Sequence, residues 1–570
     1  MNNQFSNRKF SFHLPLKRVI LIGLIFFLTF SWVGVVSGST SFSAIASKQD
    51  IPQNQLQSYA SQDETANSLT SNLSLDYSTF LGGNSSDYGA DIAVDNSGST
   101  YITGYTSSAN FPTKNAYNAT FGGKFDVFLA KFNSAGELVF STFFGGNNSD
   151  YGTGIAVDNS GFVYITGQTF SANFPTKNAI NATYGGSLGD VFVAKFASTG
   201  SLVFSTFLGE GYYAPDIAID SSGSVYITGS TSSRYFPMKN AYNATFGGYS
   251  DAFLTKLSST GDIIFSTYFG GNRTDHGTSV AVDNSDFVYI TGYTSSPDFP
   301  MKNAFNTTFG GAGYQAFIAK FTSTGSLLSS TYFGGTAESE GNDIAVDNQG
   351  SVYITGYTLS HDFPTKNAFN ATFGGIHPDI YLLSMEVFLA KFNSAGNLVF
   401  STFIGETYDN YNSGSKIALD STGNCYVTSF TKSSYFPMKN AFNATNDANG
   451  KDFISEFNGI GGMIFSSYIG DGIYGSSPSI AVDSQGSIYL TGGTDSNFPT
   501  KNALYPTFGG MTDVFLTKFF AFPPIVSSEP VSSTVTTSSS ASLFSFVFAD
   551  FLLSGLAIDI IKRKKSKRIK

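Results

Sequence analysis

Short apolar segments alternate with glycine- and asparagine-rich turns along most of the chain. These segments are rich in Val, Ile, Thr, Tyr and Phe, which predicts β-strands. The first and second segments, and the third and fourth, are joined by short turns of Asp, Asn, Ser and Gly that suit antiparallel hairpins. In the first complete set the segments are 90–95 (ADIAVD), 99–106 (STYITGYT), 126–132 (DVFLAKF) and 138–144 (LVFSTFF).

This set recurs seven times at intervals of roughly 63 residues, marked by the phrase YITG or a close variant. A period of this length marks supersecondary units that cannot bury their apolar faces alone. Seven four-stranded antiparallel units predict an all-β fold, a seven-bladed β-propeller over residues 74–520. The phrases begin at Tyr101, Tyr164, Tyr226, Tyr289, Tyr353, Tyr426 and Tyr489.

The two ends of the repeat array predict how the ring closes. Before the first unit, Leu75–Phe80 resembles a fourth strand without a blade, and after the last third strand, Asp513–Phe519, no fourth strand follows. We expect the N-terminal strand to join the last blade, which removes exposed sheet edges. In an alternative phasing each blade begins at STF and none is shared. We favour the shared blade because the IAVD strand, with alanine at its centre, suits a crowded axis.

The recurring motifs DIAVDNSGSTYITGYT, FPTKNA, GG and DVFLAKF are similar to the SBBP β-propeller repeat of bacterial and archaeal surface proteins. The resemblance covers about residues 75–520 and implies the seven-bladed propeller fold. It implies little about activity, because members of this family mostly lack an assigned one.

The N-terminal end has the pattern of an export signal. Four basic residues lie in residues 1–18 and an apolar run follows over 19–36. We expect residues 1–46 to be a signal peptide, with cleavage after Ala44-Ile45-Ala46, and residues 47–73 to be a linker. An uncleaved anchor is the alternative, since the apolar run is long for a signal.

The C-terminal end predicts a membrane anchor. Residues 521–541 are a Ser/Thr-rich linker, 542–561 form an apolar stretch long enough to span a bilayer, and 562–570 form a basic cytoplasmic tail. Asp550, near the middle of the span, costs roughly 2.5–3.5 kcal/mol on insertion scales. A partner helix, or a processing signal removed after export, would also account for this carboxylate. We expect the propeller outside the cell and the C-terminus in the cytoplasm.

Composition excludes some classes of function. The 570 residues have a formal net charge of −10, and setting aside the eleven basic residues at the two ends leaves about −21. Nucleic-acid binding needs a basic surface, so we expect no nucleic-acid partner. Cys425 is the single cysteine, which excludes an intrachain disulfide and fits a buried strand position.

The long connections contain a repeated Phe-Pro-x-Lys-Asn motif, and we expect them on one face of the propeller, where binding loops are usually found. Their lysines are the candidate ligand face, a platform for an anion or an acidic glycan. In the alternative, Phe and Pro fix the loop while each lysine is solvated or bonds a loop carbonyl. The lysines are Lys114, Lys177, Lys239, Lys302, Lys366, Lys439 and Lys501.

Six of these loops also carry an Asn-x-Thr sequon, a candidate glycosylation site on an exported surface. Heavy glycosylation would make the loops a shield rather than a docking site. The asparagines are Asn118, Asn181, Asn243, Asn306, Asn370 and Asn443.

Metal and catalytic motifs are weak. The loops before the inner strands carry Asp87, Asp150, Asp275 and Glu340, whose oxygens suit Ca²⁺, although we expect solvated turn residues instead. His276, His361 and His377 are too scattered for a metal site, and no catalytic residue or cofactor is expected. The aspartates that end the IAVD segments are predicted turn formers. An insertion, Ile376–Met385, distinguishes the fifth blade.

The sequence therefore predicts a non-enzymatic, membrane-tethered surface propeller that binds glycans or proteins. A structural component of the cell envelope is the first alternative. An extracellular lyase or hydrolase with its site at the axial mouth is the second. Near-identity of the units argues against an enzyme, whereas clustered charged groups with shifted pKa values at the axis would favour one.

Overall fold

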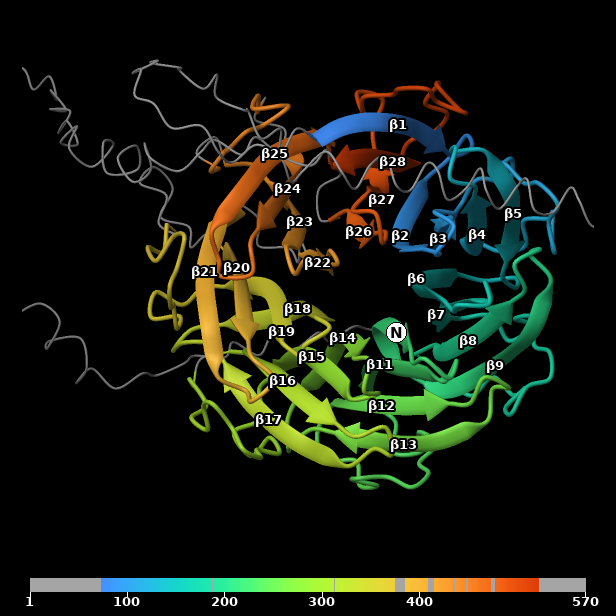
Figure 1. The fold of residues 1–570 in the computed structure, drawn as a ribbon. Coiled ribbons are helices and arrows are strands. Elements are labelled where there is room, and N and C mark those ends of the chain that lie inside the picture. Colours follow the sequence, from blue (N-terminus) through green and yellow to red (C-terminus); the bar gives the residue numbers. More distant parts are fainter. Residues whose placement is uncertain are drawn as a thin grey trace, which may run out of the picture. The chain divides into compact units, whose positions relative to one another are not determined.

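A computed structural model describes residues 73–521 of the chain, except 187, 312, 375–384, 408–414, 434–435, 447–449 and 473–476. The described residues form 28 strands, β1–β28, arranged as seven four-stranded antiparallel sheets around a centre (Figure 1). The predicted all-β, seven-bladed propeller is thus confirmed. The insertion of the fifth blade and both chain ends lie outside the described residues.

Each blade takes four strands, which run from the innermost to the outermost. The strands are β2 (Asp87–Val94), β3 (Thr100–Thr106), β4 (Asp126–Phe132) and β5 (Leu138–Phe144) in blade 1; β6 (Asp150–Val157), β7 (Val163–Thr169), β8 (Asp190–Phe196) and β9 (Leu202–Glu210) in blade 2; β10 (Tyr212–Ile219), β11 (Val225–Thr231), β12 (Asp251–Leu257) and β13 (Ile263–Phe269) in blade 3; β14 (Asp275–Val282), β15 (Val288–Thr294), β16 (Gln315–Phe321) and β17 (Leu327–Phe333) in blade 4; β18 (Ser339–Val346), β19 (Val352–Thr358), β20 (Met385–Phe392) and β21 (Leu398–Thr407) in blade 5; β22 (Lys416–Leu419), β23 (Cys425–Thr431), β24 (Lys451–Phe457) and β25 (Met463–Asp471) in blade 6; and β26 (Ser479–Val482), β27 (Ile488–Thr494), β28 (Asp513–Ala521) and β1 (Leu73–Leu81) in blade 7.

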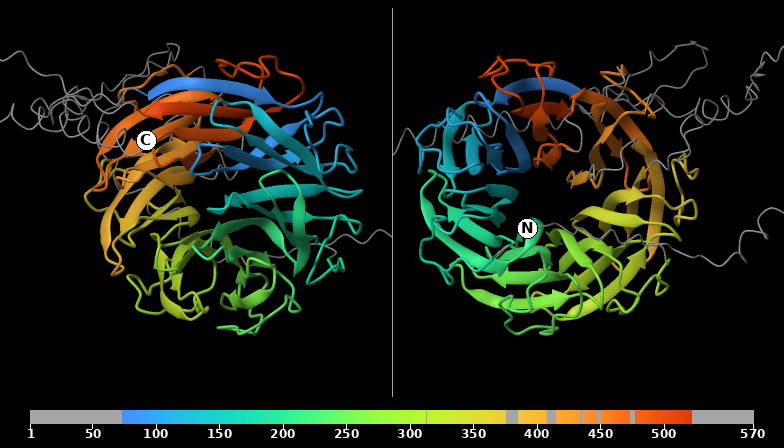
Figure 2. Two further views of the ribbon diagram at one scale, coloured as in Figure 1. Left: turned by 45° about the vertical axis from the view of Figure 1, so that its right-hand side comes forward. Right: turned by 180° about the vertical axis from the view of Figure 1, so that it is seen from behind.

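Blade 7 joins the two ends of the array, as the sequence predicts. Its strand order is β26-β27-β28-β1, and β1 pairs antiparallel with β28 from Leu73 opposite Ala521 to Leu81 opposite Val514. Figure 2 shows β1 in blue beside β28 in red from both sides of the ring. The shared blade covers the edge of β28, which would otherwise be open at the junction. It also brings both ends of the described chain to one place.

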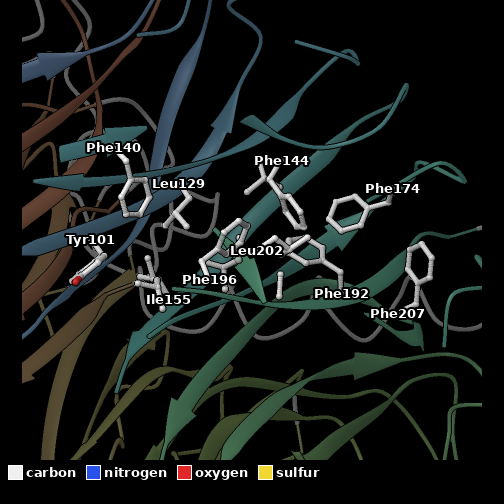
Figure 3. Packing of buried hydrophobic residues seen from close by; sticks show 14 residues of the cluster. Tyr101, Leu129, Phe140, Phe144, Ile155, Phe174, Phe192, Phe196, Leu202 and Phe207 are labelled. Atoms are coloured by element: carbon white, nitrogen blue, oxygen red, sulfur yellow. The ribbon is translucent and has the colours of Figure 1, made fainter. Parts of the chain in front are cut away.

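The core lies between adjacent blades. Figure 3 shows the cluster between blades 1 and 2, where Tyr101 and Leu129 of blade 1 face Ile155 and Phe192 of blade 2. Phe144 packs edge-to-face on the next blade, with its ring centroid 5.2 Å from that of Phe196. Aromatic pairs of this geometry add roughly 0.5–1.5 kcal/mol beyond the burial of their surface. Phenylalanine side chains therefore stabilise the contact between neighbouring blades, which cannot bury their apolar faces alone.

In blades 1 to 5 the inner strands begin earlier than the sequence predicts. Strand β2 starts at Asp87 rather than at Ala90, and its pairing with β3 shifts register between Gly89 and Asp91. A Cβ atom at Gly104, the glycine of YITG, would lie 1.9 Å from the carbonyl oxygen of Tyr88. Glycine is therefore required wherever β3 passes this irregular part of β2.

The Phe-Pro-x-Lys-Asn loops run along the outer edge of the blades. The backbone N–H of Lys114 donates to the carbonyl of Ser141 on the outermost strand, 3.1 Å away. Asn115 takes a positive φ of 46°, and its Nδ2 donates to the carbonyl of Val139 at 2.9 Å. Equivalent bridges occur in all seven blades, so each loop covers part of an edge strand that would otherwise be open to pairing with another chain.

Cys425 is buried as expected and makes no disulfide. Within the described residues no helix has the length and apolar character needed to span a membrane. The predicted signal peptide, anchor and basic tail lie outside those residues and stay predictions. So do the predicted linkers, except that Leu73 and Ala521 belong to strands β1 and β28 instead.

Candidate functional site

On the innermost strands, the residue before the Ile-Ala or Val-Ala pair changes in charge from blade to blade. Interactions between these side chains join blades 1, 3, 5 and 6 across the ring, so they lie close to its axis. We call the seven positions the axial set. In blade order they are Asp91, Gly154, Asp216, Ser279, Asp343, Lys416 and Ser479.

The aspartates of the axial set tie neighbouring blades together. Asp91 accepts hydrogen bonds from the backbone N–H of Ile155 in blade 2, at 2.8 Å, and from Ser479 Oγ in blade 7, at 2.7 Å. The other two aspartates accept in the same way from the backbone of the next blade, Asp216 from Val280 and Asp343 from Ile417, each at 2.9 Å. The carboxylates thus satisfy backbone donors on strands that have no partner on the axial side.

Lys416 supplies the positive charge of the axial set. Burial lowers the pKa of its ammonium, but the carboxylates of Asp343, Asp216 and Asp91 more than offset this and raise it. Burial also raises the pKa of Asp91 to about 6, although Lys416 opposes the shift, and it raises the pKa of Asp216. All three acids lie in alternate blades, so no two of them are immediate neighbours around the ring.

The candidate lysines lie on the outer rim. Each lysine amine donates to the carbonyl of the residue near the start of the outermost strand, at 2.5–2.8 Å, as Lys114 does to Leu138. The loops of the ligand-face prediction therefore do not surround the axial mouth, and the amines bond strand carbonyls. The sequence does not reveal this, because the direction of a long loop is not written in its pattern. A ligand role for these lysines stays a prediction.

The six sequon asparagines share one local structure. Each is half-buried, and its Oδ1 accepts a hydrogen bond from the backbone N–H of the threonine two residues on, at 2.9–3.1 Å. This is an Asx turn at the surface of the outer loops. Glycosylation of these residues stays a prediction.

The acids before the inner strands are not solvated turn residues, so that expectation is wrong. Asp87, Asp150 and Asp275 are fully buried, because the strand begins at the aspartate itself. Asp87 Oδ2 accepts from the N–H of Gly83 at 2.7 Å, and Thr106 and Ser108 also donate to this carboxylate. Burial raises the pKa of Asp275 to about 6 and that of Glu340 to about 8. Among the described residues no group of three or more His, Cys, Asp or Glu side chains is arranged to hold a metal ion.

The IAVD aspartates are turn formers, as predicted. Asp95 Oδ1 accepts from the N–H groups of Ser97 and Ser99, at 2.9 and 3.0 Å. The structure adds a feature that sequence analysis missed, since Tyr101 donates to the other oxygen at 2.9 Å and Lys131 lies over the Tyr101 ring. The signal was available, because Tyr and Lys recur at fixed places in YITG and FLAKF.

A cavity of about 500 Å³ opens among the short turns of blades 5, 6 and 7. Acidic and small polar residues line most of it, and Ile460 is a largely exposed apolar residue at its edge. The lining includes Asp347, Lys391, Asp420, Gly459, Ile460 and Asp483.

The SBBP family model, described as a β-propeller repeat, matches five segments of this chain, which are 76–112, 139–175, 205–236, 264–300 and 330–364. The chain therefore carries SBBP β-propeller repeats. The SBBP segments include the inner strands of blades 1 to 5, and the structure extends the same unit to blades 6 and 7.

One curated relative of this SBBP chain is the regulatory protein FlaEY of Caulobacter vibrioides, with 22% identity over 308 residues. The match covers 51% of this chain but only 32% of the relative. Among solved structures, the polysaccharide lyase Uly1 aligns with 79% of this chain and 98% of its own, at 9% identity and a TM-score of 0.39. The WD40 propeller domain of Doa1 aligns with 79% of this chain and 97% of its own, at 9% identity and a TM-score of 0.38. Similarities this low carry no argument about function.

Proposed function

We propose that this SBBP propeller is a non-catalytic binding scaffold, tethered to the outer face of a cell membrane, that binds glycans or proteins. The observation that carries the proposal is the state of the axial aspartates. Their oxygens are occupied by backbone N–H groups and serine hydroxyls of neighbouring blades. Side chains used to hold the ring together are poorly placed for proton transfer to a substrate.

The geometry of the chain ends supports the tether. Leu73 and Ala521 are opposite each other in the pairing of β1 with β28, on the outer edge of blade 7. The predicted linkers 47–73 and 521–541 thus leave the propeller from one place. Such a domain can be held by either end with its other blades turned away from the attachment point.

The tether is tested on intact cells that express the full chain. External protease is expected to remove the propeller while the basic tail stays protected. A tail that is digested, or a propeller protected in intact cells and digested only after lysis, contradicts the surface location.

Binding is tested with the full chain in detergent micelles on arrays of glycans and of proteins. Retention on a subset of glycans or proteins is the expected result. Silence on both arrays contradicts a binding role and favours a structural part of the cell envelope.

An extracellular hydrolase or lyase is the second candidate, and the charged axial set favours it. A carboxyl with a pKa of about 6, as for Asp91, suits proton transfer near neutral pH. Turnover of a polysaccharide panel that is lost in Asp91→Asn, in a variant that still folds, would establish this candidate in place of the scaffold.

A further inference from the structure

Six of the seven blades share a buried arrangement of Asp, Tyr and Lys on the short-turn side. The tyrosine is the second residue of the strand next to the innermost one, and the lysine lies beside it on the following strand. The lysine amine is 4.6–5.5 Å from the centre of the tyrosine ring. In blade 3 the Lys256 amine is 3.1 Å from Asp220, and Tyr226 donates to the same carboxylate at 3.1 Å. The lysines are Lys131, Lys195, Lys256, Lys320, Lys391 and Lys518.

Blade 6 keeps the aspartate and the tyrosine but replaces the lysine by Glu456. Tyr426 pairs with Glu456 in the register that joins Tyr226 to Lys256 in blade 3. The Tyr426 hydroxyl lies 3.2 Å from Glu456 Oε1 and 3.5 Å from Asp420 Oδ2. The single hydroxyl proton of Tyr426 can be donated to only one of these carboxylates at a time. Blade 6 therefore has two acids where each of the other blades has an acid and an ammonium.

Within the part of the chain that the structure describes, no ion pair joins Asp420 or Glu456 to a lysine or an arginine. The nearest lysine along the ring, Lys391 of blade 5, lies 3.5 Å from Asp347 and donates to the carbonyl of Gly459 at 3.4 Å. Burial raises the pKa of Glu456 to about 7, with the Asp420 carboxylate adding to the shift. Asn424 Nδ2 donates to Asp420 Oδ2 at 3.0 Å, which is a neutral contact.

Space for a ligand is present beside Asp420, whereas Tyr426 and Glu456 are buried next to Asp420 and do not line this space. The cavity of about 500 Å³ among blades 5 to 7 is lined by Asp420, and also by Asp347 and Asp483 from the blades on either side. Its volume exceeds that of a single ion. Three carboxylates and one ammonium, that of Lys391, line it, and this excess of negative charge favours a cationic guest.

We propose that blade 6 binds a primary alkylammonium group beside Tyr426, Asp420 and Glu456, in the place that a strand lysine takes in the six other blades. The ammonium comes from a lysine side chain of a partner protein or from a polyamine. The sibling blades show that this framework holds an alkylammonium over the tyrosine ring, a contact that Lys and Arg make with aromatic faces. Ca²⁺ instead takes six to eight oxygen ligands, which this pair of acids does not provide. The inference stands apart from the proposed location and scaffold role.

The test is calorimetric titration of the full chain in detergent micelles at about pH 8, above the raised pKa of Glu456. The probes are Nα-acetyl-lysine methylamide for a protein lysine, 1,4-diaminobutane for a polyamine, and CaCl₂. We expect one equivalent of at least one amine to bind, and the tighter of the two identifies the source. Binding should weaken as the pH falls towards 5, because Glu456 takes up a proton.

Three variants separate this site from general charge effects. Glu456→Lys restores the sibling arrangement and is expected to weaken amine binding by at least about tenfold, or 1.4 kcal/mol, while raising the melting temperature. Glu456→Gln should also weaken binding without adding a charge. Glu137→Lys makes the same charge change on an exposed turn of blade 1 and should leave binding unchanged.

Three results would overturn the proposal. The first is no amine binding by the unaltered chain, and the second is equal binding by Glu456→Lys and the unaltered chain. The third is binding of CaCl₂ alone that Glu456→Lys abolishes, which would make the pair of acids a metal site.

Discussion

The outer and inner edges of the seven blades obey different rules. On the outer edge every blade uses the same lysine and asparagine to bond the outermost strand. On the inner edge the axial set changes from blade to blade. An outer residue contacts only its own blade and the next one, so the same residues can be used in all seven blades. Inner residues all share one axis, where seven identical charges would repel one another.

The order of the axial set follows from this crowding. Acids occupy blades 1, 3 and 5, while Gly154, Ser279 and Ser479 leave three of the remaining blades uncharged, and Lys416 occupies blade 6. Each acid is thereby free to accept a backbone N–H of the next blade. The repeat therefore changes at positions where several copies meet at one place. It stays constant where each copy contacts only an equivalent neighbour.

The largest expected effect comes from breaking the outer edge where the ring closes. A chain that begins after Leu81 lacks β1 and the buried side chains of Tyr77, Phe80 and Leu81. Because β28 then has an open edge, we expect a loss of at least about 4 kcal/mol of stability together with self-association. Calorimetry and size-exclusion chromatography measure both effects.

The matched control begins at residue 73 and keeps β1. It should unfold cooperatively as a monomer, like the longer chain. Equal behaviour of the two truncated chains would mean that β1 does not close the ring.

Lys416→Met tests the inner edge. Removing the ammonium leaves three carboxylates near the axis, and we expect a loss of about 1–3 kcal/mol at pH 8. The loss should be smaller at pH 5, because Asp91 and Asp216 have raised pKa values and take up protons. Thermal melts at both pH values give the result, and Lys124→Met, at an exposed site, should behave like the unaltered chain. Equal destabilisation at the two pH values would contradict the electrostatic role.

The pH dependence of the unaltered chain reports the acids between blades. Burial raises the pKa values of Asp126, Asp251 and Asp513 to about 6, above those of an unfolded chain. The folded state therefore binds more protons than the unfolded state, so stability should rise by about 1–2 kcal/mol as pH falls from 7.5 to 5. Below about pH 4 stability should fall again, because Asp95 and Asp220 have lowered pKa values. The prediction would be wrong if the melting temperature rose as the pH increased from 5 to 7.5.

The smallest effects should come from single outer-edge positions. Asn115→Ala loses the bond to Val139 and places alanine at a positive φ, so we expect a cost of about 1 kcal/mol. Asn115→Gly keeps the backbone relaxed and should cost less. Urea unfolding compares the two variants, and an equal cost would show that backbone strain does not contribute.

Strand content and ring closure were predictable because they depend on local patterns. The third and fourth strands of blade 1 match their predicted bounds, and Leu75–Phe80 lies within β1. The start of the inner strand was missed, because NSSDYG contains residues typical of turns although Asp87 is buried. A buried aspartate among polar residues has no signature until its hydrogen-bond donors come together in the fold.

The sequence also did not predict the axial set, because part of the predicted orientation of the inner strands was wrong. The inner-strand alanines were expected at the axis, whereas Ala93 packs against blade 2 and Ile92 packs towards blade 7. Asp91 shares the face of Ala93, and the variation before each Ile-Ala pair was the signal that could have identified it. The rim position of the lysines had no such signal, because it depends on where a loop turns back.

The meeting of Leu73 and Ala521 across one sheet has a practical consequence for protein engineering. A short peptide could join them and let the chain be opened at another tight turn, such as residues 96–98, with every strand pairing retained. The propeller is therefore suited to circular permutation and to insertion into a loop of a host protein.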